Sequence, residues 1–177
     1  ERILEAFAAG GADVLVGTQM VAKGHHFPQV TFVGIVLADI GLSIPDFRAG
    51  ERLFGLLAQV AGRAGRGADA GRVLIQTFNP DHYAVAAAKA HDYAAFYVKE
   101  LEARRELLYP PFARLLRLVF ESTKREKALE VADAFAKTLV AKSGRGVQVL
   151  GPAPAVIDRI KGVYRYQLLV KGRSLAQ

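Results

Sequence analysis

An apolar run rich in valine and isoleucine, residues 30–38, limits the folds open to this chain more than any other feature. The run lacks the alternation of a half-exposed strand and is typical of a strand covered on both faces, as in a parallel sheet. A helix with one apolar face is expected over residues 49–61, and a second apolar strand over residues 71–78. Strand, helix and strand in this order predict an α/β fold with a parallel sheet and flanking helices.

A break in regular structure is expected at the sequence YPPF, residues 109–112, because proline fixes its own backbone and restricts the residue before it. We therefore predict two domains, residues 1–108 and residues 109–177, of which the second is a small α+β domain. Before the break, helices are expected over residues 82–90 and 93–107, and a short buried strand over residues 12–16. The chain opens within a helix that has no capping residue, which suggests that it begins inside a larger domain.

Charge is divided unevenly along the chain. Residues 1–104 hold 10 Lys and Arg against 11 Asp and Glu, whereas residues 105–177 hold 14 against six, giving net charges of −1 and +8. The basic region favours a polyanion such as nucleic acid as partner, although a solvated basic surface would have the same composition. The chain has no cysteine and its four histidines show no metal-ligand spacing, so we expect no metal site. Without a signal peptide or a membrane-length apolar run, a cytoplasmic location without membrane association is expected.

The basic region has a pattern of its own. Residues 113–120 alternate apolar and basic side chains, as in a half-exposed strand, and residues 123–126 fit a capping box at the start of a helix. Two more strands are expected at residues 147–150 and 163–170, joined by a loop that contains Arg159 and Lys161. On the last strand Tyr164 and Arg165 point to opposite faces, which suits base stacking and phosphate contact, although tyrosines in strands also serve core packing. These four residues are the candidate DNA contacts.

Two stretches carry further candidate site residues. The stretch GTQMVAKG, residues 17–24, follows the first expected strand, where ligands collect in open α/β sheets, and its Lys23 offers a mobile cation. The stretch QVAGRAGRG, residues 59–67, closes the 49–61 helix. Its Arg63 and Arg66 are three residues apart, so their guanidiniums would share one side of a helical turn and could bind a phosphate. An ordinary turn and a flexible basic loop are the respective structural alternatives.

These two stretches, together with ADIGLSIPDFRAGER, VLIQTFNPDHYAV, YPPF and GPAPAVIDRIKGVYRYQLLVKG, resemble the PriA family of bacterial primosomal replication-restart helicases. The resemblance covers essentially the whole chain. The related fork-reversal helicase RecG carries a similar arginine motif but would not be expected to carry PDFRAGER or YPPF. The fold that the resemblance implies is the C-terminal part of a second RecA-like helicase lobe, followed by a domain that helps to hold branched DNA.

The resemblance also implies residue roles. Helicase motif V contacts the nucleic-acid backbone and communicates with the nucleotide site, and it is matched here by Gly17, Thr18, Gln19, Lys23 and Gly24. Motif VI faces ATP bound on the other lobe, and it is matched by Gln59, Gly62, Arg63 and Arg66. Within motif VI, Arg66 occupies the position of the arginine finger.

Much of the family's machinery is absent from the sequence: the phosphate loop, the acidic Mg²⁺ motif and the cysteines that bind structural zinc. We therefore expect a fragment of an ATP-dependent superfamily-two DNA helicase acting in replication restart, inactive alone, with ATP and Mg²⁺ bound mainly by the missing lobe. The partners implied are forked DNA, single-stranded DNA-binding protein and other primosome proteins. The alternative is a non-catalytic nucleic-acid-binding module on a helicase-like scaffold.

Overall fold

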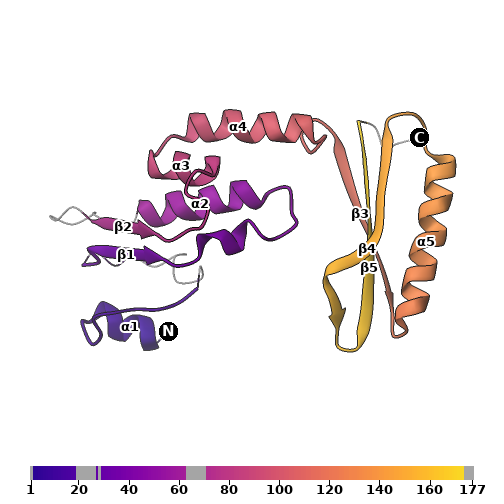
Figure 1. Ribbon diagram of the computed structural model, residues 1–177. Helices are drawn as coiled ribbons and strands as arrows, with labels where there is room; N and C mark the ends of the chain where they lie inside the picture. Colours follow the sequence, from indigo (N-terminus) through magenta and orange to yellow (C-terminus); the bar gives the residue numbers. More distant parts are fainter. Residues whose placement is uncertain (1, 19–26, 28, 63–70, 174–177) are drawn as a thin grey trace. The chain divides into compact units, whose positions relative to one another are not determined.

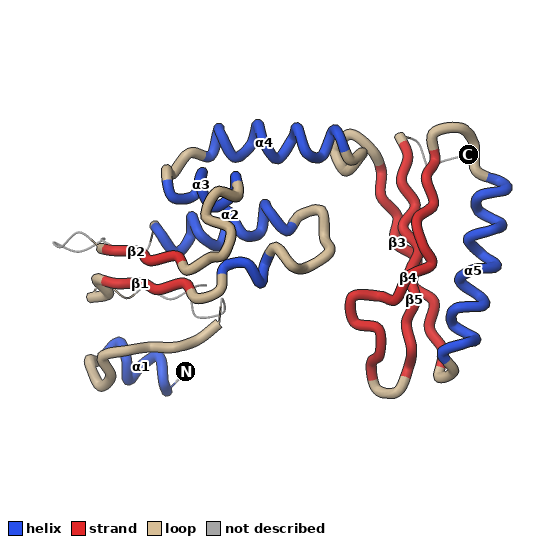
Figure 2. Tube along the Cα trace, viewed as in Figure 1, coloured by secondary structure: helices blue, strands red, loops and turns tan. Residues whose placement is uncertain are grey.

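The computed structural model of the chain describes residues 2–18, 27, 29–62 and 71–173, and these form two compact units (Figures 1 and 2). The first unit is Glu1–Tyr97 and the second is Val98–Gln177. The division falls inside a helix, α4 (Tyr93–Glu106), that continues from one unit into the other. The predicted boundary after residue 108 lies just beyond this helix and remains a prediction.

The first unit contains the expected strand–helix–strand arrangement. Its elements are α1 (Arg2–Ala8), β1 (Phe32–Ile35), the 3-10 helix η1 (Ala38–Gly41), α2 (Ala49–Ala61), β2 (Arg72–Ile75) and α3 (Tyr83–Lys89). Strands β1 and β2 pair in parallel, with Phe32 opposite Arg72 and Ile35 opposite Ile75. A parallel pair needs a crossover connection, and α2 lies within that connection. The mixed α/β architecture predicted from the sequence is therefore confirmed.

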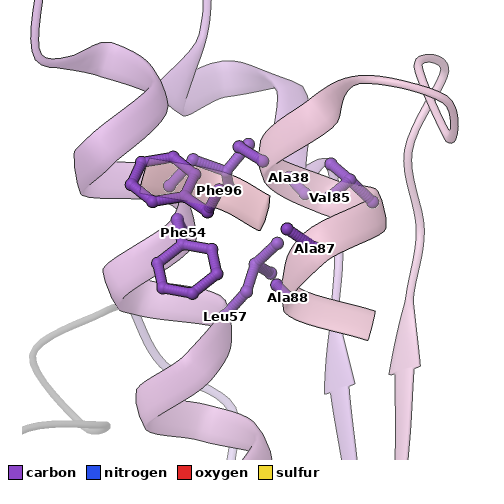
Figure 3. Close-up of a cluster of buried hydrophobic side chains, with 9 residues drawn as sticks. Ala38, Phe54, Leu57, Val85, Ala87, Ala88 and Phe96 are labelled. Atoms are coloured by element: carbon purple, nitrogen blue, oxygen red, sulfur yellow. The ribbon is translucent and has the colours of Figure 1, made fainter. Parts of the chain in front are cut away.

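The core of the first unit lies between α2, α3 and one face of the sheet. Leu57 is fully buried, and Phe54 stacks on Phe96 with ring centroids 4.2 Å apart (Figure 3). Ile35 and Ile75, opposite each other in the sheet, pack against this cluster from the strands. The apolar spacing of α2 thus explains its orientation, since the residues that recur every three or four positions are the ones that reach the core.

Two expectations for the first unit are wrong. Residues 12–16 form no strand, and Val14 and Val16 are 75% and 89% exposed rather than buried. The apolar run at residues 30–38 gives a strand of four residues that is covered on one face, because Phe32 on β1 and Leu74 on β2 are 59% and 60% exposed. An apolar run therefore located the strand correctly but overstated its length and its burial.

The second unit is an antiparallel sheet with a helix packed on one face. Its strands are β3 (Arg114–Ser122), β4 (Val147–Ile160) and β5 (Val163–Gly172), in the order β3-β5-β4, and its helix is α5 (Arg125–Lys142). Ala128 and Ala132 of α5 pack on Tyr166 and Phe120. The expected capping box is wrong, because Lys124 is the N-cap residue and makes no side-chain capping bond. Short alanine side chains on the inner face allow α5 to lie close to the sheet.

Within the second unit, buried charged groups hold the end of α4 and the YPPF segment in place. Arg104 pairs with Glu100 at 2.7 Å and donates to the carbonyl of Pro110 at 3.3 Å. Lys171, 9% exposed, donates to the carbonyl of Leu107 at 2.9 Å, and its ammonium lies 4.8 Å from the ring centroid of Tyr109. Buried charges are tolerated when they are paired in this way, so these contacts fix the YPPF segment against the sheet.

The described part of the chain lacks two other kinds of feature. None of its helices has the length and apolar character that crossing a membrane requires. Nor does any group of three or more His, Asp or Glu side chains there come together in a way that could hold a metal ion.

We expect Leu57→Ala to lower the free energy of unfolding by about 2–5 kcal/mol, because it leaves a cavity in the core of the first unit. Leu74→Ala removes the same atoms from a side chain that is 60% exposed and serves as the matched control. Urea denaturation of both variants measures the difference. Equal losses in the two variants would contradict the position assigned to this core.

Candidate functional site

The carboxylate of Asp39 joins the segments that follow the two parallel strands. It accepts hydrogen bonds from the Thr77 hydroxyl at 2.9 Å, the Phe78 backbone amide at 2.9 Å and the Asn79 side-chain amide at 2.7 Å. The Asn79 bond, followed by that of Phe78, lowers the pKa of Asp39 from 3.8 to about 2. A carboxylate with three donors and this pKa stays ionised near neutral pH, so it acts as an anchor and is unsuited to proton transfer.

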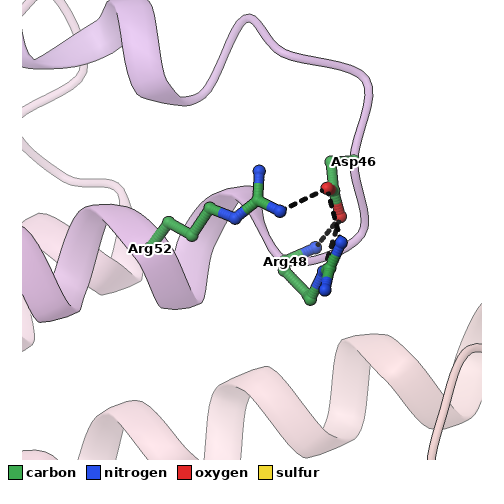
Figure 4. Close-up of polar contacts among 3 residues, drawn as sticks. All are labelled: Asp46, Arg48 and Arg52. Atoms are coloured by element: carbon green, nitrogen blue, oxygen red, sulfur yellow. Dashed lines mark hydrogen bonds and ion pairs between the residues drawn. The ribbon is translucent and has the colours of Figure 1, made fainter.

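A second acidic residue organises the start of α2. Asp46 accepts hydrogen bonds from the backbone and side chain of Arg48, at 3.0 and 3.1 Å, and forms an ion pair with Arg52 at 2.8 Å (Figure 4). The hydrogen bond from the Arg48 side chain is the main cause that lowers the pKa of Asp46. Both arginine side chains are half-exposed. These three side chains form an ordered cluster with one more positive than negative charge.

The residues matched to the two helicase motifs are only partly within the described structure. Gly17 and Thr18 are exposed and lie outside regular secondary structure. Gln59 lies in the last turn of α2, half-buried, and the helix ends at Gly62. The remaining candidates lie outside the described residues: Gln19, Lys23, Gly24, Arg63 and Arg66. Their roles, and any meeting of the two motifs, stay predictions.

The candidate DNA contacts of the second unit lie together on the β4–β5 hairpin. Arg159 belongs to β4, where a loop was expected, and its guanidinium lies 4.9 Å from the ring centroid of Tyr164 on β5. Lys161 is exposed in the turn between the strands. Hairpin pairing places Arg159 opposite Tyr164. The structure thus brings together a cation, an aromatic ring and a second exposed cation.

Arg165 differs from its neighbours on this hairpin. Its Nε donates to the Glu121 carboxylate at 2.8 Å, and its Nη1 donates to the carbonyl of Ile157 at 3.4 Å. Its guanidinium therefore joins all three strands of the sheet. This use within the fold competes with the DNA contact predicted for Arg165.

Arg125 is a residue that the sequence analysis did not select as a site residue. It was assigned to a helix cap, but its Nε donates to the Tyr166 hydroxyl at 3.1 Å, beside the hairpin. This bond raises the pKa of Arg125, and the charge of Asp158 on β4 raises it further. A distance of 41 residues separates Arg125 from Tyr166 in the sequence. No local pattern could have indicated the pair.

Comparison with known proteins gives consistent relatives. Residues 105–177 match the family described as Primosomal protein N C-terminal domain. The chain is 51% identical over 174 residues to the replication restart protein PriA of Treponema pallidum, which covers 98% of this chain and 26% of that protein. The proteins of the same name from Bacillus subtilis and Synechocystis are 46% and 45% identical, covering 100% and 96% of this chain but 22% and 20% of their own length. The chain thus spans about a quarter or less of these relatives.

The pKa of Asp39 leads to a testable pH dependence. Because the folded-state value, about 2, lies below the ordinary 3.8, the charged carboxylate stabilises the fold above about pH 4. That contribution is lost as the pH falls from 3.8 towards 2. Asp39→Asn should therefore melt at a lower temperature than the unmodified protein at pH 7, and the gap should narrow below pH 4.

Melting curves across this pH range, with Asp13→Asn on an exposed segment of the same unit as control, measure the gap. A gap for Asp39→Asn that stays constant down to pH 2 would contradict the role of the charge.

Proposed function

The chain belongs to the PriA family of replication restart proteins, and on this premise we propose that it forms part of an ATP-dependent superfamily-two DNA helicase. Residues 1–108 would supply the C-terminal part of the second RecA-like lobe, and residues 109–177 a DNA-binding C-terminal domain. The observation that carries the proposal is the identity of 45–51% to three relatives across nearly the whole chain. The parallel pair β1–β2 with its crossover helix is compatible with such a lobe.

The proposed catalytic role rests on the sequence that follows α2. Arg63 and Arg66 come directly after a helix whose inner face is buried through Leu53, Leu57 and Val60. Such anchoring suits a group that must meet a nucleotide held on another lobe. In the closed state, Arg66 would stabilise the charge that develops on the transferred phosphoryl group of ATP, and Gln59 and Arg63 would assist it. Gly17, Thr18, Gln19, Lys23 and Gly24 would couple this site to the DNA strand.

The residues that bind ATP and Mg²⁺, and any zinc ligands, would lie outside this chain. A phosphate loop binds the nucleotide and its Mg²⁺, and residues 1–177 contain none. Zinc does not fit the residues of this chain, which has no cysteine. We therefore assign ATP and Mg²⁺ binding mainly to the other lobe and assign no zinc to this chain. We expect no ATP hydrolysis by this chain alone.

The proposed DNA contacts lie on the second unit. Residues 98–177 hold 16 Lys and Arg against eight Asp and Glu, a net charge of +8. Arg159 and Lys161 would contact phosphates, and Tyr164, with a guanidinium already over its ring, would stack on a base. Forked DNA is the proposed substrate, and single-stranded DNA-binding protein and other primosome proteins are proposed partners in the cytoplasm. The three relatives described above are replication restart proteins, which does not favour the alternative of a non-catalytic module.

In the longer protein that contains this chain, Arg66→Ala should bind ATP and forked DNA almost normally but lose hydrolysis. Arginine fingers in GTPases contribute roughly 10³–10⁵ in rate, so we expect a loss of at least about a hundredfold. Arg66→Lys should restore little, because an ammonium lacks the planar fork of donors. Turnover and melting temperature are measured on both variants. A stable Arg66→Ala protein with near-normal turnover would refute the assignment.

The salt dependence of DNA binding distinguishes cations that are exposed to solvent from cations that are paired within the fold. Each phosphate contact contributes a log–log slope of about −0.7 on single strands, so Arg159→Ala with Lys161→Ala should reduce the slope by roughly two contacts. Arg165→Ala removes the same charge from a group paired with Glu121 and should change the slope less while lowering the melting temperature more. Titrations at several salt concentrations test this. Equal slope changes per charge would contradict the distinction.

A further inference from the structure

The β4–β5 hairpin contains a large bulge whose residues have no assigned role. Pro154 pairs with Tyr166 and Arg159 pairs with Tyr164, so residues 155–158 of β4 lie opposite Arg165 alone. Figure 2 shows β4 turning away from β5 over this stretch and returning to it before the turn. A bulge re-aims side chains relative to a regular strand. Here it is large enough to change which side chains reach the solvent.

Two adjacent apolar side chains are presented by this bulge. Val156 and Ile157 are 52% and 58% exposed, and Ile160, just beyond it, is 41% exposed. In a regular strand neighbouring side chains point to opposite faces, so one of an apolar pair can turn towards a core. At the bulge both members of the pair are in contact with water. A group of apolar side chains held in solvent is a feature of contact surfaces.

Two features hold the backbone of the bulge in place. Arg165 donates to the carbonyl of Ile157 at 3.4 Å while it pairs with Glu121 of β3 at 2.8 Å. Ala155, at the start of the bulge, is buried. The apolar pair is therefore displayed on a backbone fixed at both its first residue and its middle, so little conformational entropy would be lost when a partner binds.

Basic groups flank the apolar pair. Arg159 follows the bulge with its guanidinium over Tyr164, and Lys161 is exposed in the next turn. Arg125 is bonded to Tyr166, which pairs with Pro154 just before the bulge. Asp158 is the acidic residue of this stretch, and it acts on the Arg125 charge. Exposed apolar side chains next to two exposed cations match the chemistry of unstacked bases next to phosphates better than that of a purely apolar protein surface.

We propose that Val156 and Ile157 form an apolar wedge that contacts unstacked bases at the branch point of a DNA junction, with Arg159 and Lys161 on the adjacent phosphates. The inference rests on the proposed DNA-binding function of the second unit. Val156 and Ile157 occupy the space beside a base that has lost its stacking partner. A fully paired duplex offers no such base, so the wedge makes the chain favour branched over linear DNA.

The test compares binding of this chain to a three-way DNA junction and to a paired duplex of equal length. Val156→Ser with Ile157→Ser removes apolar contact but no charge. We expect junction affinity to fall about tenfold, the ratio that corresponds to about 1.4 kcal/mol, and duplex affinity and the salt slope to stay unchanged. A 2-aminopurine base at the branch should change fluorescence on binding of the unmodified chain, and the change should be lost in the double variant.

The matched control is Val131→Ser with Val140→Ser, two valines of α5 that are 48% and 62% exposed. Both double variants are checked for an unchanged melting temperature. Junction preference and fluorescence retained in the bulge variant would overturn the wedge and leave the proposed DNA-binding function intact. Equal losses in the bulge and control variants would also overturn it. Absence of binding to any DNA by the unmodified chain would overturn the proposed DNA-binding function, and the wedge with it.

Discussion

The hydrogen bonds to one carboxylate, that of Asp39, connect the two halves of the first unit. Strands β1 and β2 have four residues each, so the ladder between them is short. The carboxylate extends the connection beyond the ladder by binding Thr77, Phe78 and Asn79 after β2. Ala38, next to it, is buried in the core that α2 and α3 share. Ala38 therefore links the segment that carries the Asp39 contacts to the core against which α2 packs.

In the second unit, some basic residues form contacts within the fold and others are exposed to solvent. Arg165 joins the three strands, Lys171 holds the segment before β3, and Arg125 binds the hydroxyl of Tyr166. Arg159 makes no ion pair within the described part of the chain, and Lys161 is exposed in a turn. The net charge of +8 thus overstates the charge available to a polyanion. Composition indicates the class of partner, but only contacts show which cations remain to meet it.

The sequence predicted elements whose pattern is local and missed features that depend on distant contacts. The bounds of α2 agree with the range predicted from its apolar spacing, about residues 49–61. Strand β4 was predicted to end at residue 150, since Gly151, Pro152 and Pro154 argue against a strand, yet it continues to Ile160 as an edge strand, where proline is tolerated. The Asp39–Asn79 bond spans 40 residues and has no local signature. Roles for Arg63 and Arg66 came from resemblance and could not be derived from spacing.

Gly151 allows β4 to make the first of two register shifts that precede the proposed wedge. Its φ is +107°, in the region that glycine favours, and a Cβ there would lie 2.8 Å from the carbonyl oxygen of Gln167. Any larger residue would push β4 away from β5 at the first of its two register shifts, between Leu150 and Ala153. The second shift, which exposes Val156 and Ile157, begins only after Pro154 has paired again with Tyr166. Gly151 therefore permits the first shift, and the separate second shift displays the apolar pair.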